Sequence, residues 1–173
     1  MNKVFGKLID FISPPTLVYA HCDIPCGIYD PHNAQMAAHT VIRMTTLINE
    51  LPEPKPDWKK KEADSWAHKL SRYTSVKEEH AELVNREIRI LWADYFKPEH
   101  LNKHPKLHEI VWNILKTASK ARQEVDIQVA DKLLDEVNTL AEIFWQTKNM
   151  GHTKFRAPYP TERETVYPTS KKN

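Results

Sequence analysis

The only two cysteines of the chain, Cys22 and Cys26, stand beside His21 near the start of the sequence. An imidazole and two thiols this close together can bind a metal ion. Pro25 and Gly27 disfavour a regular helix here, because proline lacks the backbone N–H and glycine permits positive φ. A tight loop at this point could therefore turn both sulfur atoms toward one metal ion.

These donors suit a square-planar metal better than zinc. A structural zinc site usually has four side-chain ligands, and the sequence has no second pair of cysteines. If the chain is cut after Ala20, His21 gains a free α-amine, and the amide nitrogen of Cys22 lies between that amine and the Cys22 sulfur. The amine, the amide and two thiolates are four in-plane donors suited to Ni(II) or Cu(II), and the His21 ring could be a fifth, axial ligand. An uncut chain would lack the amine.

Residues 1–20 are the segment that such a cut would remove. Val18 and Ala20 suit the small-residue positions of a signal peptidase site, but Lys7 and Asp10 interrupt the apolar stretch that a secretory signal needs. The alternatives are a short amphipathic leader or a loosely docked N-terminus. We predict a cleaved leader, and a cytoplasmic protein because the export signal is weak and the thiols must stay reduced.

The elements that must position this loop are predicted to be four amphipathic helices. Three glycines among 173 residues favour an all-α domain, and Asp30-Pro31 is a typical helix start. Apolar residues recur at helical spacing, which predicts an antiparallel four-helix bundle over residues 31–150. The predicted helices cover about 31–51, 64–96, 105–122 and 125–148. Residues 151–173, rich in proline, threonine and charge, are predicted to form an extended tail.

The charge and hydropathy of the sequence argue against two classes of partner, nucleic acids and membranes. The formal net charge is +2, and basic residues are interspersed with acids, so nucleic acid is not expected as the main partner. No apolar run approaches the roughly 20 residues of a membrane span. The sequence therefore predicts neither a nucleic-acid partner nor a membrane span.

Residues 21–31, HCDIPCGIYDP, resemble the N-terminal nickel hook of the nickel superoxide dismutases. Residues 91–98, LWADYFKP, and 143–148, IFWQTK, also resemble this family, and the similarity spans about residues 21–150. The resemblance implies a four-helix bundle with one nickel ion per subunit, a leader removed by a maturation protease, and assembly into a homohexamer. The implied reaction converts superoxide to oxygen and hydrogen peroxide by Ni(II)/Ni(III) cycling.

The resemblance also implies roles for individual residues. The metal ligands would be His21, Cys22 and Cys26, in a hook that occupies residues 21–30. Two tyrosines would stand over the open face of the metal, and a lysine would attract superoxide. These gate and steering residues are Tyr29, Tyr95 and Lys97, and the residues that shape the hook are Asp23, Pro25 and Gly27.

The sequence departs from the family where the axial imidazole is usually supported. Ala37 stands in place of a glutamate, and His80 in place of the arginine beside it. Such outer partners tune the orientation and basicity of a ligand, so we hypothesise that His80 takes over this support. Tyr29 and Tyr95 could instead be packing aromatics, and Lys97 a solvated helix end.

Two other functions compete with the dismutase. The hook could serve a nickel or copper binding protein that delivers metal without turnover. Cys22 and Cys26 could also shuttle through a disulfide, although three intervening residues are not the usual spacing of such oxidoreductases.

Overall fold

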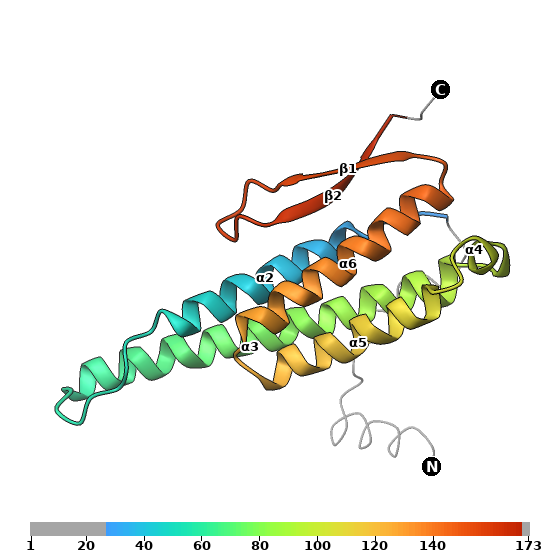
Figure 1. Cartoon of the computed structure of the whole chain (residues 1–173). Helices are drawn as coiled ribbons and strands as arrows, with labels where there is room; N and C mark the ends of the chain where they lie inside the picture. The colour runs from blue at the N-terminus through green and yellow to red at the C-terminus, as the bar shows by residue number, and fades with distance from the viewer. Residues whose placement is uncertain (1–26, 171–173) are drawn as a thin grey trace, which may run out of the picture.

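The computed structural model describes residues 27–170 and consists mainly of four long antiparallel helices (Figure 1). Each helix packs against two others in the ring α2, α3, α5, α6. The predicted all-α bundle is confirmed. No helix in the described part of the chain has the length and apolar character needed to cross a membrane. The four helices are α2 (His32–Asn49), α3 (Lys60–Ile90), α5 (Leu107–Gln123) and α6 (Ile127–Thr147).

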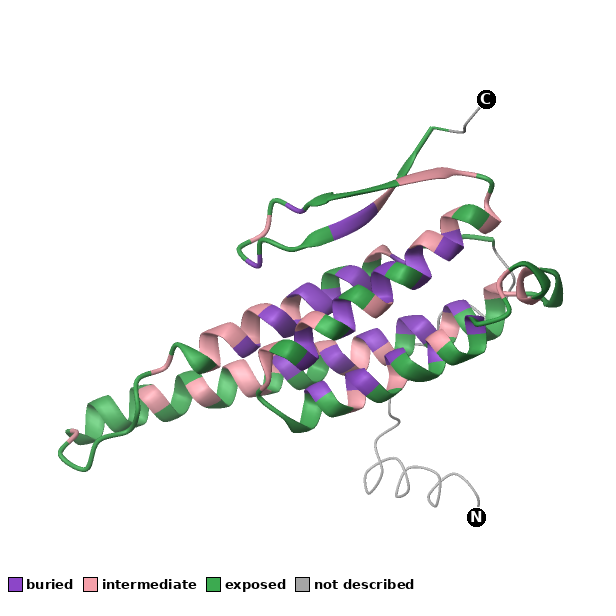
Figure 2. Cartoon of the chain, viewed as in Figure 1, coloured by how far each residue is buried: buried purple, intermediate pink, exposed green. Residues whose placement is uncertain are grey.

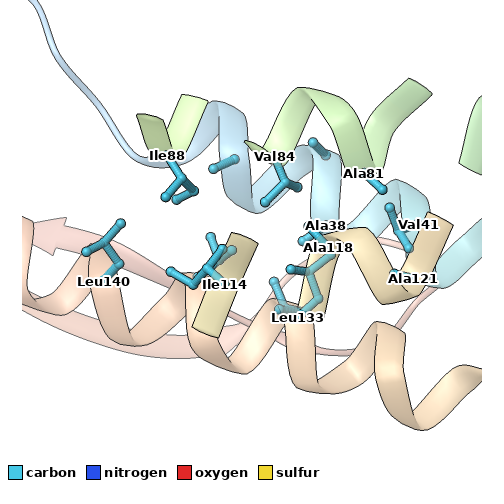
Figure 3. Close-up of a cluster of buried hydrophobic side chains, with 14 of the residues drawn as sticks. Ala38, Val41, Ala81, Val84, Ile88, Ile114, Ala118, Ala121, Leu133 and Leu140 are labelled. Carbon is cyan, nitrogen blue, oxygen red and sulfur yellow. The ribbon is translucent and has the colours of Figure 1, made fainter. Parts of the chain in front are cut away.

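The core lies along the inner faces of these helices (Figures 2 and 3). Alanines at several contact points let the helices approach closely, and branched side chains fill the remaining space. Burial of each of these aliphatic side chains contributes about 1.5–3 kcal/mol to the free energy of unfolding. The bundle is therefore a stable scaffold for the residues at its ends. The N-terminal end of α3 extends past this core and is largely exposed. The labelled core residues are Ala38, Val41, Ala81, Val84, Ile88, Ile114, Ala118, Ala121, Leu133 and Leu140.

A buried lysine joins α3 to the C-terminal end of α5. Lys77 is 1% exposed, and its Nζ donates to the carbonyl groups of Ala121, Arg122 (3.0 Å) and Glu124 (2.9 Å). Burial lowers the pKa of Lys77, and Glu78 acts in the opposite direction. The ammonium group satisfies carbonyls that the end of a helix leaves without partners.

The segment that follows α3 differs from the prediction of one helix ending at Phe96. α3 passes into a π-helical turn, η1 (Leu91–Tyr95), in which the Phe96 N–H donates to the Leu91 carbonyl at 3.0 Å. A short helix, α4 (Pro98–Lys103), then begins with Pro98 at its first position. Pro98 therefore starts a helix rather than only ending one, because its missing N–H costs nothing there.

Residues 151–169 form a hairpin that the sequence analysis did not predict. Strands β1 (Gly151–Arg156) and β2 (Glu164–Thr169) are antiparallel, with Gly151 opposite Thr169 and Arg156 opposite Glu164. Figure 1 shows the hairpin lying over α2 and α6 of its own chain, and both strands contact α6. This differs from the extended tail that the sequence predicts: the strands are extended, but they pair with each other and dock on the bundle.

Buried polar side chains of α2 hold the hairpin in place. The two ring nitrogens of His39 lie 2.7 Å from the hydroxyl groups of Thr161 and Thr165. Gln35 Nε2 donates to the Val166 carbonyl at 3.1 Å and to Asn138 Oδ1 on α6 at 2.9 Å. These bonds supply the polar partners that Gln35 and His39 need, since both are almost fully buried.

Candidate functional site

The described chain begins with the last residues of the predicted hook. Gly27 has φ +75°, a left-handed conformation that favours glycine. Three residues later the Asp30 carboxylate accepts a hydrogen bond from the His32 N–H at 2.7 Å, and Pro31 already has helical backbone angles. This confirms the predicted Asp-Pro helix start. The residues from Gly27 to Pro31 therefore lead directly into α2.

The structure brings the two predicted gate tyrosines together. The ring centroids of Tyr29 and Tyr95 are 5.5 Å apart, and Tyr95 also packs against Phe144 of α6 at 4.6 Å. Figure 1 shows the start of the described chain at the same end of the bundle as α4 and the C-terminal end of α6. The π-helical turn matters here because it holds one more residue than an α-helical turn, which changes the direction of the side chains that follow. It ends at Tyr95, whose ring packs against α6.

Three further residues contact the Tyr95 side chain. Its hydroxyl oxygen lies 2.6 Å from Thr147 Oγ1, and Lys148 Nζ lies 4.8 Å from its ring centroid. The His100 ring stacks on it at 5.5 Å. Burial raises the pKa of Tyr95, and the hydrogen bond with Thr147 opposes this in part. Tyr95 is therefore a fixed, neutral phenol at neutral pH.

The predicted steering residue lies next to this cluster in the chain. Lys97 is exposed and stands between η1 and α4, where its backbone N–H donates to His100 Nδ1 at 3.1 Å. Partial burial lowers the pKa of His100, Glu99 acts in the opposite direction, and Lys97 lowers it further. Lys97 and Lys148 place positive charge at this end of the bundle. The Lys148 ammonium is the one that the structure places directly over a gate ring.

A cavity of about 150 Å³ lies beside the residues that leave the hook. Glu87 lines this cavity; the residue is only 9% exposed and is the one buried acidic residue among residues 27–170. Arg86 NH2 lies 3.4 Å from its carboxylate. The cavity is lined by Ile28, Tyr29, Asp30, Asn33, Glu87, Ile90 and Leu91.

The two residues that depart from the family pattern lie on neighbouring helices. Ala37 is buried on α2 and offers no polar group. His80 is half-buried on α3, and its Nδ1 lies 2.8 Å from the Val76 carbonyl, which can only accept. Nδ1 therefore carries a proton, and Nε2 is the ring nitrogen that remains for another partner.

The predicted ligands lie outside the described residues. This applies to His21, Cys22 and Cys26, and also to Asp23 and Pro25. Within residues 27–170, no group of three or more His, Cys, Asp or Glu side chains is arranged to hold a metal ion. The structure thus describes the surroundings of the hook and leaves its ligand set as a proposal.

The family model of nickel-containing superoxide dismutase matches residues 16–148. The chain belongs to this family. The enzymes named superoxide dismutase [Ni] from Streptomyces coelicolor and Streptomyces seoulensis are each 38% identical to it over 136 residues, which is 79% of this chain and 94% of theirs. A solved native structure of nickel superoxide dismutase superposes with a TM-score of 0.63 at 37% identity, covering 74% of this chain and 99% of that chain.

The family match covers the hook and the helical bundle but not the C-terminal hairpin. The matched residues include the hook, Tyr95 and all of α6, whereas the hairpin lies beyond residue 148. Thr147 and Lys148 lie within the family-like stretch 143–148, which gives neither residue a role by itself. Only the fold shows that both residues contact Tyr95.

Proposed function

We propose that this chain is a superoxide dismutase whose nickel is held by a hook that begins at His21. Its membership of the nickel-containing family is the observation that carries this proposal. The reaction takes two superoxide anions and two protons and yields one oxygen and one hydrogen peroxide. Bound nickel supplies the one-electron Ni(II)/Ni(III) couple that oxidises one superoxide and reduces the next. The protein supplies the ligands, the access route and the electrostatic field.

The residues of the hook fit nickel in this role. Thiolates from Cys22 and Cys26, the amide of Cys22 and the amine and ring of His21 would hold the metal, and these strong donors suit Ni(II). Strong electron donors lower the potential at which Ni(III) is reached. The left-handed backbone of Gly27 supports a non-helical conformation at this point, as a hook requires.

The described residues around the hook support selection of a small anion. Tyr29 and Tyr95 form an aromatic pair next to the hook, which would restrict access to small molecules. Lys97 and Lys148 lie at the same end of the bundle and would attract superoxide by long-range electrostatics. Such attraction raises the association rate and weakens as ionic strength increases.

We further propose that the active enzyme arises by removal of residues 1–20. The α-amine of His21 exists only after this cut, so the uncut chain would lack one of the four in-plane donors. The mature subunits would assemble into a homohexamer in the cytoplasm, where the hook thiols stay reduced. A protease that cuts after Ala20 is therefore a required partner.

The test compares two chains loaded with Ni(II), one starting at His21 and one starting at Met1. We expect rapid superoxide consumption by the first and weak nickel binding without activity for the second. Cys26→Ser in the shorter chain is the control for activity of loosely bound nickel. Tight nickel binding without turnover by the shorter chain would instead support a metal-delivery protein. Full activity of the uncut chain would show that the amine is not a ligand.

The assembly is tested separately by sedimentation of the nickel-loaded mature chain. We expect a homohexamer at micromolar concentration. A monomer at that concentration would contradict the proposed assembly without bearing on the metal site of a single subunit.

A further inference from the structure

The hydroxyl of Thr147 lies within hydrogen-bond distance of two oxygen atoms but carries only one proton. Thr147 Oγ1 lies 2.7 Å from the Phe144 carbonyl oxygen and 2.6 Å from the Tyr95 hydroxyl oxygen. A carbonyl carries no proton, so the Thr147 hydroxyl must donate to Phe144. Its proton is then used, and the bond between Tyr95 and Thr147 needs a proton from Tyr95. The hydrogen bonds therefore run from the Tyr95 hydroxyl to the Thr147 hydroxyl and from the Thr147 hydroxyl to the Phe144 carbonyl.

This direction controls what Tyr95 can offer to an anion. A phenol has one proton, and that of Tyr95 is already donated to α6. Its oxygen can still accept hydrogen bonds but cannot donate one to a negatively charged ligand without breaking the bond to Thr147. An anion beside Tyr95 therefore meets lone pairs rather than a donor.

We propose that Thr147 is a positioning residue that keeps the Tyr95 hydroxyl proton in a hydrogen bond with α6, so that Tyr95 limits access without donating a hydrogen bond to the anion. This rests on the proposed function, in which Tyr95 faces the open side of the metal. Lys148, the next residue, lies with its ammonium 4.8 Å from the same ring and attracts anions without a hydrogen bond from the phenol. Adjacent residues at the end of α6 thus set the two properties of the gate, namely attraction and weak retention.

Weak retention suits a fast reaction of a small anion. A donor at the gate would stabilise bound superoxide or peroxide and slow the release of product. A hydrogen bond that keeps the phenol proton inside the bundle removes that donor while the ring still restricts access. Burial also raises the pKa of Tyr95, so the phenol keeps this proton at neutral pH.

The experiment removes the Thr147 hydroxyl and measures anion binding with azide as the probe. In the nickel-loaded enzyme, Thr147→Val should free the Tyr95 proton and tighten azide binding about two- to tenfold, the range expected for one added hydrogen bond. Thr147→Ser keeps the hydroxyl and should bind azide as the original enzyme does. Thr139→Val is the matched control, because Thr139 donates to a carbonyl of the same helix at 2.9 Å from an exposed position.

A second readout does not depend on nickel. The Cζ resonance of Tyr95 in the metal-free chain, identified by its loss in Tyr95→Phe, should shift in Thr147→Val and stay in place in Thr147→Ser. An unmoved resonance would overturn the hydrogen-bond direction. A shifted resonance with unchanged azide affinity would overturn the effect on the gate. If Thr147→Val does not fold, Thr147→Ala removes the same hydroxyl and carries the same expectations.

The two proposals fail in different ways. Absence of turnover by nickel-loaded enzyme would refute the proposed function, whereas the Tyr95 resonance would still report the hydrogen bond. A double variant completes the test, since Tyr95→Phe should abolish the azide effect of Thr147→Val if that effect arises from the phenol proton.

Discussion

Acid should weaken the attachment of the C-terminal hairpin, because a buried neutral histidine holds it. His39 is 4% exposed, and both ring nitrogens bond to hydroxyl groups of the hairpin. In a neutral ring one nitrogen donates and the other accepts, so the two threonines complement it. Burial, with smaller contributions from His32 and Arg163, lowers the pKa of His39 from the ordinary 6.5 to about 4.

The sign and size of the effect follow from this pKa. Between pH 6.5 and 4 the unfolded chain binds a proton at His39 and the folded chain does not, so the free energy of unfolding falls as the pH falls through this range. A tenfold change in a proton-binding constant corresponds to about 1.4 kcal/mol. Because the pKa of His39 falls from 6.5 to about 4 on folding, the full loss in the free energy of unfolding is about 3 kcal/mol. The contribution is fully present above pH 6.5 and lost at about pH 4.

Urea unfolding of the nickel-free chain at pH 7.5, 5.5 and 4 measures this loss. Other groups also titrate, so the decisive quantity is the comparison with His39→Gln, which should lose about 3 kcal/mol less between pH 7.5 and 4. His68→Gln, at an exposed position of α3, is the matched control and should follow the original chain. Parallel pH dependence of the original chain and His39→Gln would refute the reasoning.

Three further predictions concern other parts of the molecule. Lys77→Met should lower the free energy of unfolding in urea by about 2–4 kcal/mol, because it leaves helix-end carbonyls without a donor, whereas exposed Lys69→Met should change it by less than about 0.5 kcal/mol. Lys148→Gln should lower kcat/KM at low salt about two- to fivefold and make it less dependent on ionic strength, and an unchanged salt dependence would contradict steering by this residue. His80→Ala should alter the nickel EPR spectrum if its Nε2 supports the His21 ring, and unchanged activity with an unchanged spectrum would exclude this role.

The bundle could be predicted from the sequence because its signals are local. Apolar spacing, the Asp30-Pro31 start and the proline run after Leu51 each act within one helix, and burial then reinforces them. The hairpin could not be predicted in this way. Its strands are short, and they are held by contacts with His39, Gln35 and Asn138, which lie far away in the sequence. Nothing in residues 151–169 alone indicates those partners.

The residues of the proposed hook stand close together in the chain, so the sequence by itself was enough to predict the kind of metal site and the family. The proposed ligand set of His21, Cys22 and Cys26 needs no residue from a distant part of the sequence. The surroundings of that site were decided by the tertiary structure. Tyr29 meets Tyr95, and Tyr95 meets Thr147 and Lys148, only because four helices and a π-helical turn bring their ends together. The physical reason is that residues a few positions apart can form a metal site without the rest of the fold. The direction in which a hydroxyl group donates its proton depends instead on which groups the fold places within about 3 Å of it.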